Sequence, residues 1–161
     1  MNLIKYNSPF GVINIAEQNG AISRVYLPNH HAGTDTADAQ CAPLLVEARK
    51  QFDEYFSGTR RYFDLPLSFD GCTDFMTRVY HALLEIKYGQ TASYKDIAAR
   101  IGAPKAYRAV GLANNKNILP ILVPCHRIIG ADGGLTGYAG GLELKARLLE
   151  LERANINIKI T

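Results

Sequence analysis

The run Pro124-Cys125-His126-Arg127 places a thiol, an imidazole and a guanidinium next to one another in the chain. Only the thiolate form of a cysteine is a strong nucleophile or metal ligand, and an ordinary cysteine has a pKa of about 8.5. A neighbouring histidine can help to ionise Cys125 if a third group holds the imidazole ring in place. A Cys-His pair also occurs for purely structural reasons, so the run alone leaves both interpretations open.

The segments around Cys125 predict the elements that position it. The apolar stretch 118–123 directly before the run is typical of a short buried strand. Residues 136–141 form a glycine-rich loop without the spacing or the Lys-Ser/Thr ending of a phosphate-binding P-loop, which favours a flexible pocket wall. A last helix is predicted from Leu142 past Glu152. The residues from Asn155 alternate in polarity, which leaves an edge strand or a frayed end open.

Three helices are predicted between Thr73 and the cysteine. Thr73 is a candidate N-cap for a helix that ends by Gly89. Ser93-Tyr94-Lys95-Asp96 matches the capping-box pattern, and a further helical stretch covers residues 105–115. Two short helices joined by a turn that contains Gly102 predict a helix-turn-helix. The last of these helices is rich in Ala and Gly, which suits either close approach to a minor groove or close packing of two helices.

The N-terminal third predicts a small α/β unit. Two β-rich runs joined through Asn19-Gly20 are typical of a hairpin, because both central residues of such a turn need a positive φ. A proline fits the first turn of a helix, and a glycine fits the residue after its end. The expected elements are strands at 2–7, 11–16 and 21–27, a surface loop at 28–42, a helix at 43–56 and a strand at 62–65.

Composition and charge narrow the class of protein. The chain has 161 residues, 47% of them hydrophobic and 20% charged, which is ordinary for a globular protein. Three cysteines without CxxC spacing predict a reducing compartment, hence a cytoplasmic protein with neither a disulfide framework nor a metal site. Residues 87–127 carry seven Lys or Arg and one acid, which suits a polyanion as partner or simply a solvated basic surface. No segment predicts a membrane span.

Taken together, these segments closely resemble the O6-alkylguanine-DNA alkyltransferases, also called methylated-DNA–protein-cysteine methyltransferases. The most specific part is 120–127, which looks like the family's proline-cysteine-histidine-arginine box with its apolar run. Ser93-Tyr94, 108–111, Asn117, 138–141 and Glu152 resemble further blocks of the family at the expected separations. The resemblance is strong over residues 73–153 and covers residues 1–66 only in outline.

The resemblance implies an α/β (α+β) fold with two domains and a tail. These are an N-terminal, ribonuclease H-like α/β domain with an antiparallel sheet (1–68), a mostly helical DNA-binding and alkyl-acceptor domain with a helix-turn-helix (73–155), and a tail (156–161). It also assigns roles to individual residues. The residues so assigned are, for catalysis, Cys125, His126, Glu152, Tyr94 and Asn117; for DNA binding, Arg108, Tyr94, Ala109, Arg127, Lys105, Ala106 and Gly111; and for the substrate pocket, Val123, Tyr138, Ala139 and Gly140.

The resemblance further implies direct DNA repair. Cys125 is expected to take the alkyl group irreversibly from O6-alkylguanine, and less efficiently from O4-alkylthymine, in duplex DNA bound through the minor groove. The damaged base is flipped out of the helix first, since its O6 group lies inside the duplex. The expected protein is a monomer that reacts once and needs no cofactor or metal. Two other classes stay open: a non-catalytic lesion-binding protein of the alkyltransferase-like kind, and a Cys-His-Glu hydrolase unrelated to DNA.

Overall fold

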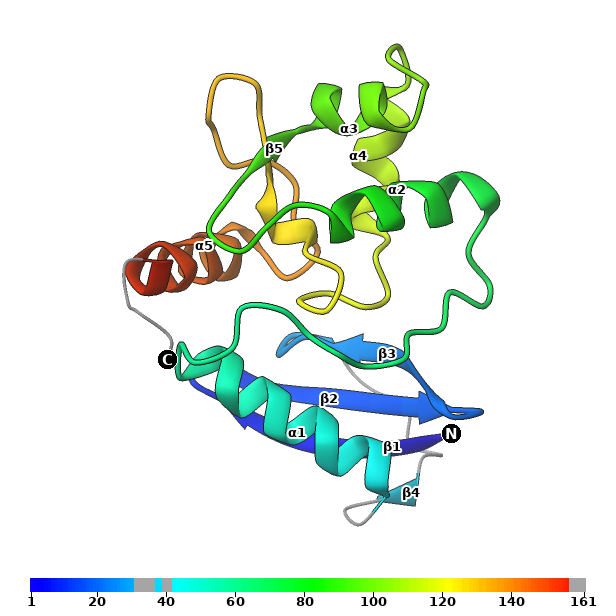
Figure 1. Cartoon of the computed structure of the whole chain (residues 1–161), viewed down its shortest axis with the longest axis vertical. Coiled ribbons are helices and arrows are strands. Elements are labelled where there is room, and N and C mark those ends of the chain that lie inside the picture. Colours follow the sequence, from blue (N-terminus) through cyan, green and yellow to red (C-terminus); the bar gives the residue numbers. More distant parts are fainter. Residues whose placement is uncertain (31–36, 39–41, 157–161) are drawn as a thin grey trace. The chain divides into compact units, whose positions relative to one another are not determined.

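The computed structural model describes residues 1–30, 37–38 and 42–156, and the chain divides into two compact units (Figure 1). The first unit comprises residues 1–70 and combines a mostly antiparallel sheet with one helix, whereas the second begins at Gly71 and is mostly helical. The predicted α/β fold class is thereby confirmed. Cys41, one of the three cysteines, and the tail beyond Ile156 lie outside the described part. No helix in that part is long and apolar enough to cross a membrane.

The predicted hairpin of the first unit is present. Asn19 and Gly20 have φ angles of 53° and 79°, the positive values that a tight two-residue turn between strands requires. The turn fixes the register, because one residue of slippage would exchange the buried and exposed faces of the strands. The three strands are β1 (Asn2–Ser8), β2 (Gly11–Gln18) and β3 (Ala21–Tyr26).

A fourth strand lies in the segment that we expected to be only a surface loop. Ala37–Asp38 forms β4, which pairs in parallel with Asn2 and Leu3 of β1 and gives the strand order β3-β2-β1-β4. A pairing of two residues leaves no periodic pattern in the sequence, so the strand could not be predicted. The pairing covers the first part of the β1 edge, at Asn2 and Leu3, where backbone groups would otherwise be unpaired.

Helix α1 (Pro43–Phe56) lies across β1 and β2 (Figure 1) and supplies most of the unit's aromatic core. Tyr6 of β1 meets Phe52 and Phe56 of the helix at ring-centroid distances of 5.6 and 6.1 Å. The Tyr6 hydroxyl donates a hydrogen bond of 2.7 Å to Asp53. One face of the sheet and one face of the helix are therefore joined by both apolar and polar contacts.

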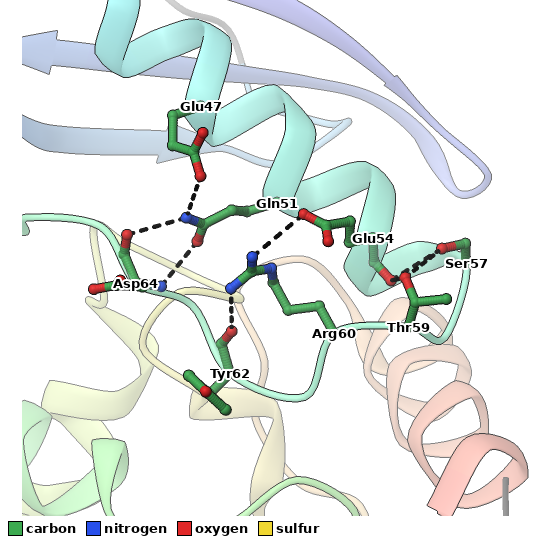
Figure 2. A network of polar contacts seen from close by, with 8 residues as sticks. All are labelled: Glu47, Gln51, Glu54, Ser57, Thr59, Arg60, Tyr62 and Asp64. Carbon is green, nitrogen blue, oxygen red and sulfur yellow. Dashed lines mark hydrogen bonds and ion pairs between the residues drawn. The ribbon is translucent and has the colours of Figure 1, made fainter. Parts of the chain in front are cut away.

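The segment 62–65 is not a strand, contrary to our prediction. Its backbone is bound by a side chain: the Asp64 N–H donates to the Gln51 amide oxygen (2.8 Å), and the Gln51 amide nitrogen donates to the Asp64 carbonyl (3.0 Å) (Figure 2). Gln51 is 2% exposed and also donates to Glu47 at 2.9 Å. The amide thus satisfies both backbone groups of Asp64, which therefore need no partner strand.

Gln51→Leu should lower the stability of the first unit, because it leaves the two backbone groups of Asp64 without this partner. The expected loss is about 1–2 kcal/mol, as for two part-buried hydrogen bonds. Urea unfolding of the whole chain, followed by circular dichroism, would measure it. Gln18→Leu is the matched control, since Gln18 is an exposed glutamine of the same unit. Equal midpoints for the two variants would show that the Gln51 contacts contribute nothing.

Helical caps open two helices of the second unit as the sequence predicted. The Thr73 hydroxyl accepts from the Met76 N–H (3.1 Å), and Ser93 and Asp96 form the reciprocal capping box. The third helix begins two residues later than expected, at Tyr107, because a turn closed from the Ala106 N–H to the Ala103 carbonyl (2.8 Å) precedes it. The helices are α2 (Asp74–Leu84), α3 (Tyr94–Arg100) and α4 (Tyr107–Asn115).

A short parallel pairing links the start of α3 to the cysteine segment. Strand β5 (Ala92–Ser93) pairs with β6 (Ile128–Ile129), which directly follows a single 3-10 turn, η1 (Cys125–Arg127). Ser93 is also the N-cap of α3, so the pairing fixes where that helix begins relative to Cys125. The last helix, α5 (Leu142–Ile156), follows the glycine-rich loop as predicted.

Candidate active site

A tight turn, and not the strand that we predicted at 118–123, leads into the cysteine. The Val123 N–H donates to the Leu119 carbonyl at 2.8 Å, which closes the chain on itself. Ile121 within this turn has a φ of 74°, in the left-handed region that is unfavourable for a β-branched residue. Backbone strain of this kind persists only where the surroundings hold it in place. The apolar run 118–123 is buried, or nearly so, as expected, but in a folded-back conformation.

Asn117 holds the turn together from inside. Its side-chain oxygen accepts from the Leu119 N–H, and its amide nitrogen donates to the Val123 carbonyl, both at 2.9 Å. The Cys125 N–H also donates to the Val123 carbonyl (2.7 Å), across Pro124. Two internal donors thus occupy both lone pairs of that carbonyl. The carbonyl oxygen of Val123, a residue that we expected in the substrate pocket, is therefore bound within the fold.

Cys125 is buried, with 2% of its surface exposed. Burial raises the pKa of its thiol to about 11, although the Asn117 amide, the Lys145 charge and the Tyr138 hydroxyl oppose the shift. The resting side chain is therefore a neutral thiol at neutral pH. A reaction at this sulfur requires a base that takes the proton as the sulfur attacks.

The next residue can be that base. His126 is fully buried, and its Nε2 lies 2.6 Å from a carboxylate oxygen of Glu152. Burial lowers the pKa of His126, although the Glu152 charge opposes this, so the ring is neutral. Since Glu152 is an ionised acceptor, Nε2 carries the proton and donates it, and Nδ1 keeps a free lone pair. Nδ1 is buried and makes no hydrogen bond to any described residue.

Glu152 is the centre of the buried polar network. Besides His126, it accepts from Arg127 Nε (2.8 Å), from a second guanidinium nitrogen of Arg127 (3.1 Å) and from the Gly89 N–H (3.1 Å). Burial by itself raises the pKa of a carboxyl group, but the contacts with His126 and Arg127 outweigh it and hold the pKa of Glu152 well below its usual range. The carboxylate is therefore charged and fixed in orientation.

Arg127 is inside the fold, although we expected it to contact DNA. Its side chain is buried, its guanidinium forms the paired contact with Glu152, and it also donates to the Ile86 carbonyl at 2.7 Å. The guanidinium lies 5.7 Å from the centre of the Tyr88 ring. Arg127 balances the buried charge of Glu152, and a charge used in this way is not available to a phosphate.

Apart from Tyr94 of α3, the other residues that we expected to bind DNA lie on α4 and on the turn before it. Lys105, Arg108 and Ala109 are exposed, and Ala106 and Gly111 are half-buried. A side-chain carbon at Gly111 would lie 3.6 Å from the Tyr94 ring, which is ordinary contact, so the fold itself does not require a glycine there. This stretch presents two cations and small side chains on one surface, which suits close approach to a nucleic acid.

The expected pocket residues do not all point inward. Tyr138 is buried, and burial raises the pKa of its hydroxyl well above the ordinary value, with a further contribution from the neighbouring Cys125. Ala139 is exposed and Gly140 is half-buried. Tyr94 is half-buried, and its hydroxyl reaches Thr136 Oγ1 at 2.9 Å. The structure thus brings Cys125, His126, Glu152, Asn117 and Tyr138 together, with Tyr94 attached to the same loop as Tyr138.

Sequence reasoning missed three residues of the site. Asn114 donates to the Cys125 carbonyl (3.3 Å), Lys145 donates to the Thr136 carbonyl (2.7 Å), and Thr136 also contacts Tyr94. Lys145 is fully buried, and its burial lowers its pKa to about 8. It had a signal in the sequence: it lies seven residues before Glu152, on the helical face that Leu148 shares, where a charge is unusual. The other two gave no comparable signal.

Metal coordination has no candidate in this part of the molecule. Among residues 1–30, 37–38 and 42–156, no group of three or more His, Cys, Asp or Glu side chains is arranged to hold a metal ion.

Comparison with known proteins gives consistent matches along the whole chain. Residues 1–69 match the family model described as the ribonuclease-like domain of 6-O-methylguanine DNA methyltransferase, and residues 74–154 match its DNA-binding domain. The methylated-DNA–protein-cysteine methyltransferase of Mycobacterium bovis is 54% identical over 96% of this chain and 94% of its own. The constitutive enzyme of that name from Bacillus subtilis is 46% identical over 94% and 95%.

Solved structures show the same likeness. The crystal structure of Mycobacterium tuberculosis OGT in complex with DNA superposes with a TM-score of 0.88 and 42% identity, covering 96% of this chain and 94% of that chain. The O6-methylguanine-DNA methyltransferase from the archaeon Pyrococcus kodakaraensis superposes with a TM-score of 0.65 and 25% identity, over 94% and 98%. The fold of this chain is therefore shared with these proteins.

Proposed function

The chain belongs to the 6-O-methylguanine DNA methyltransferase family, whose members transfer methyl groups from DNA to a cysteine, and from this premise we propose that Cys125 is the acceptor of the alkyl group. The observation that carries the proposal is the buried, hydrogen-bonded pair of His126 and Glu152 (2.6 Å), in which His126 directly follows the buried Cys125 in the chain. A nucleophile, a base and a group that orients the base are thereby present in one place.

The transfer is a displacement at carbon. His126 takes the thiol proton through a water molecule, the sulfur forms a bond to the alkyl carbon, and the bond from that carbon to guanine O6 breaks with its electron pair left on the base. The raised pKa of Cys125 makes the base necessary, and the charge of Glu152 stabilises the imidazolium that forms. The product is a thioether. The carbon–sulfur bond of an alkyl thioether is stable to water, so each molecule reacts once.

The departing guanine carries the negative charge that develops. A hydrogen-bond donor directed at the base lowers the barrier as this charge forms. Tyr94 fills this role, because its hydroxyl reaches the glycine-rich loop that also carries Tyr138, next to Cys125. The substrate is O6-alkylguanine, with O4-alkylthymine as a poorer one, since both place an alkyl group on an exocyclic oxygen of a base.

The damaged base has to leave the duplex to reach a buried thiol. Flipping costs a few kcal/mol, and the cost is smallest for a pair that the lesion already weakens. We propose that α4 enters the minor groove and that Arg108 takes the place of the flipped nucleotide, because Arg108 is exposed near the start of a helix that also carries the small residues Ala109 and Gly111. Lys105 is also exposed and binds phosphate in this proposal. The protein is proposed to act as a monomer.

The units differ in their roles under this proposal. The second unit contains every residue proposed to act, so it is the DNA-binding and alkyl-acceptor domain, and the first unit supports it. The free thiol of Cys125 suits the reducing conditions of the cytoplasm.

Intact-mass spectrometry tests the proposal directly. After incubation with a duplex that contains one O6-methylguanine, the protein should gain the mass of one methyl group, located on the peptide with Cys125 and not exceeded with excess DNA. An unchanged mass in a folded protein that still binds this DNA would instead identify a lesion-binding protein without transfer activity.

Arg108→Ala should slow repair in duplex DNA far more than reaction with free O6-benzylguanine, because only the duplex requires a base to be flipped. We expect a loss of at least tenfold in the duplex reaction, which corresponds to about 1.4 kcal/mol. Single-turnover rates with the two substrates measure the difference. Lys50→Ala, which removes one exposed positive charge from α1, is the control. Equal losses with both substrates would exclude a flipping role for Arg108.

A further inference from the structure

Thr136, the first residue of the glycine-rich loop, connects two elements on either side of that loop. Its carbonyl oxygen accepts from the Lys145 ammonium of α5 at 2.7 Å. Its hydroxyl oxygen lies 2.9 Å from the Tyr94 hydroxyl at the start of α3, and the Tyr94 hydroxyl lies 3.3 Å from the same carbonyl. Thr136 is therefore bound through both its backbone and its side chain.

The loop around Thr136 is also held close to a third element. Gly137 has a φ of 33°, and a side-chain carbon there would lie only 3.2 Å from the Asn115 amide nitrogen of α4. Lys145 is fully buried, and a buried ammonium must keep a hydrogen-bond acceptor. Together, these contacts hold the backbone at Thr136 in place, and its exposed side chain is thereby kept within hydrogen-bond distance of the Tyr94 hydroxyl.

The hydrogen atoms of this contact can be assigned from chemistry. The Thr136 carbonyl accepts a hydrogen bond from the charged ammonium of Lys145 at 2.7 Å, whereas the Tyr94 hydroxyl lies 3.3 Å from the same oxygen. The bond from the ammonium is therefore the stronger of the two. If the Thr136 hydroxyl donates to the Tyr94 oxygen, the phenolic proton is free to point at a bound base. A phenol that accepts a hydrogen bond is also a better donor, because hydrogen bonds in a chain polarise one another.

We propose that Thr136 is a positioning residue for alkyl transfer: its hydroxyl donates to the Tyr94 oxygen and directs the phenolic proton to the departing guanine. This inference rests on the proposed function, in which Tyr94 donates to the base. Thr136 does not touch the alkyl group or the sulfur. It acts through Tyr94, while Lys145 holds its backbone in place.

A double-mutant cycle with Tyr94→Phe tests this coupling in the full-length chain. The rate of transfer from a duplex containing O6-methylguanine is measured in single turnover at saturating protein, and the affinity for the same duplex is measured separately. Thr136→Val should slow transfer about three- to tenfold, as for the loss of one hydrogen bond, with DNA affinity unchanged. Thr136→Ser keeps the hydroxyl and should restore most of the rate.

The cycle separates this inference from the proposed function. In the Tyr94→Phe background, Thr136→Val should have no further effect, because there is no phenolic proton left to direct. An equal effect of Thr136→Val in both backgrounds, or none in either, would overturn the role of Thr136 while leaving that of Tyr94 intact. If Tyr94→Phe itself does not slow transfer, the proposed role of Tyr94 is the part that fails.

Two further variants guard against a purely structural effect. Thr77→Val removes a threonine hydroxyl that donates to the Thr73 carbonyl in α2, far along the chain from the loop, and should leave transfer unchanged. Thr136→Ala replaces Thr136→Val in the same cycle if the valine variant does not fold. A loss of rate in Thr77→Val as large as in Thr136→Val would contradict a specific role for Thr136.

Discussion

Cys125→Ala is expected to abolish alkyl transfer completely while the affinity for DNA is retained. The sulfur is the only atom that we propose forms a bond to the alkyl group, so no residual rate should remain. Binding should survive, because Cys125 is buried whereas Lys105 and Arg108 are exposed. Alanine is also a mild replacement, since it fills most of the volume of a cysteine and buries no unpaired polar group.

The measurement is transfer of a radiolabelled methyl group from duplex DNA to protein, with binding to the same duplex followed by fluorescence anisotropy. Cys72→Ala is the control, since Cys72 is a cysteine of the same unit and is less buried than Cys125. It should accept one methyl group per molecule, as the natural chain does. Transfer that persists in Cys125→Ala and disappears in Cys72→Ala would show that Cys72, and not Cys125, is the acceptor.

Glu152→Gln should reduce both activity and stability by large amounts. Without the carboxylate, His126 loses the group that orients its ring, and the expected loss of rate is about 10²–10⁴-fold, the contribution of a positioned general base. The guanidinium of Arg127 is then buried without its counter-charge, which should cost about 3–5 kcal/mol of folding free energy. Rates are therefore compared at temperatures where circular dichroism shows the variant folded.

Stability should also depend on pH through Glu152. The carboxyl has a lower pKa in the folded chain than in the unfolded chain, so its stabilising contribution is complete above about pH 5. It is lost as the pH falls toward the folded-state pKa, because the unfolded chain then binds the extra proton. His126 contributes in the same direction. Because its pKa is lowered in the folded chain, the ring is protonated first in the unfolded chain as the pH falls below about 6.5, and this lowers the stability of the folded chain.

Acid unfolding of the natural chain and of two variants measures how much Glu152 contributes to the pH dependence of stability. Glu152→Gln should lack the part of the pH dependence below about pH 5 that this carboxyl supplies. Glu150→Gln makes the same substitution at an exposed position of α5 and should behave as the natural chain does in both rate and stability. The same acid profile for all three proteins would mean that Glu152 is not held ionised by the fold.

Local signals in the sequence predicted most of the secondary structure. The Asn19-Gly20 turn and the Ser93 capping box are decided by residues within a few positions of one another, and both are present. The predictions of strands at 62–65 and 118–123 were wrong for the opposite reason. The backbone groups of these segments are bound by the side chains of Gln51 and Asn117, which no periodic pattern reveals. In 118–123 the apolar content predicted burial but not conformation.

The sequence by itself determined the chemistry available to this protein: a Cys-His pair, a later glutamate, and a basic stretch around a helix of small residues. The tertiary structure alone decided how that chemistry is distributed. It placed Arg127 against Glu152 instead of on the surface. It also joined Lys145 of α5 to Thr136, at the start of the glycine-rich loop. Burial is the physical reason, because a charge or a hydroxyl removed from water takes its role from the partners that the fold supplies.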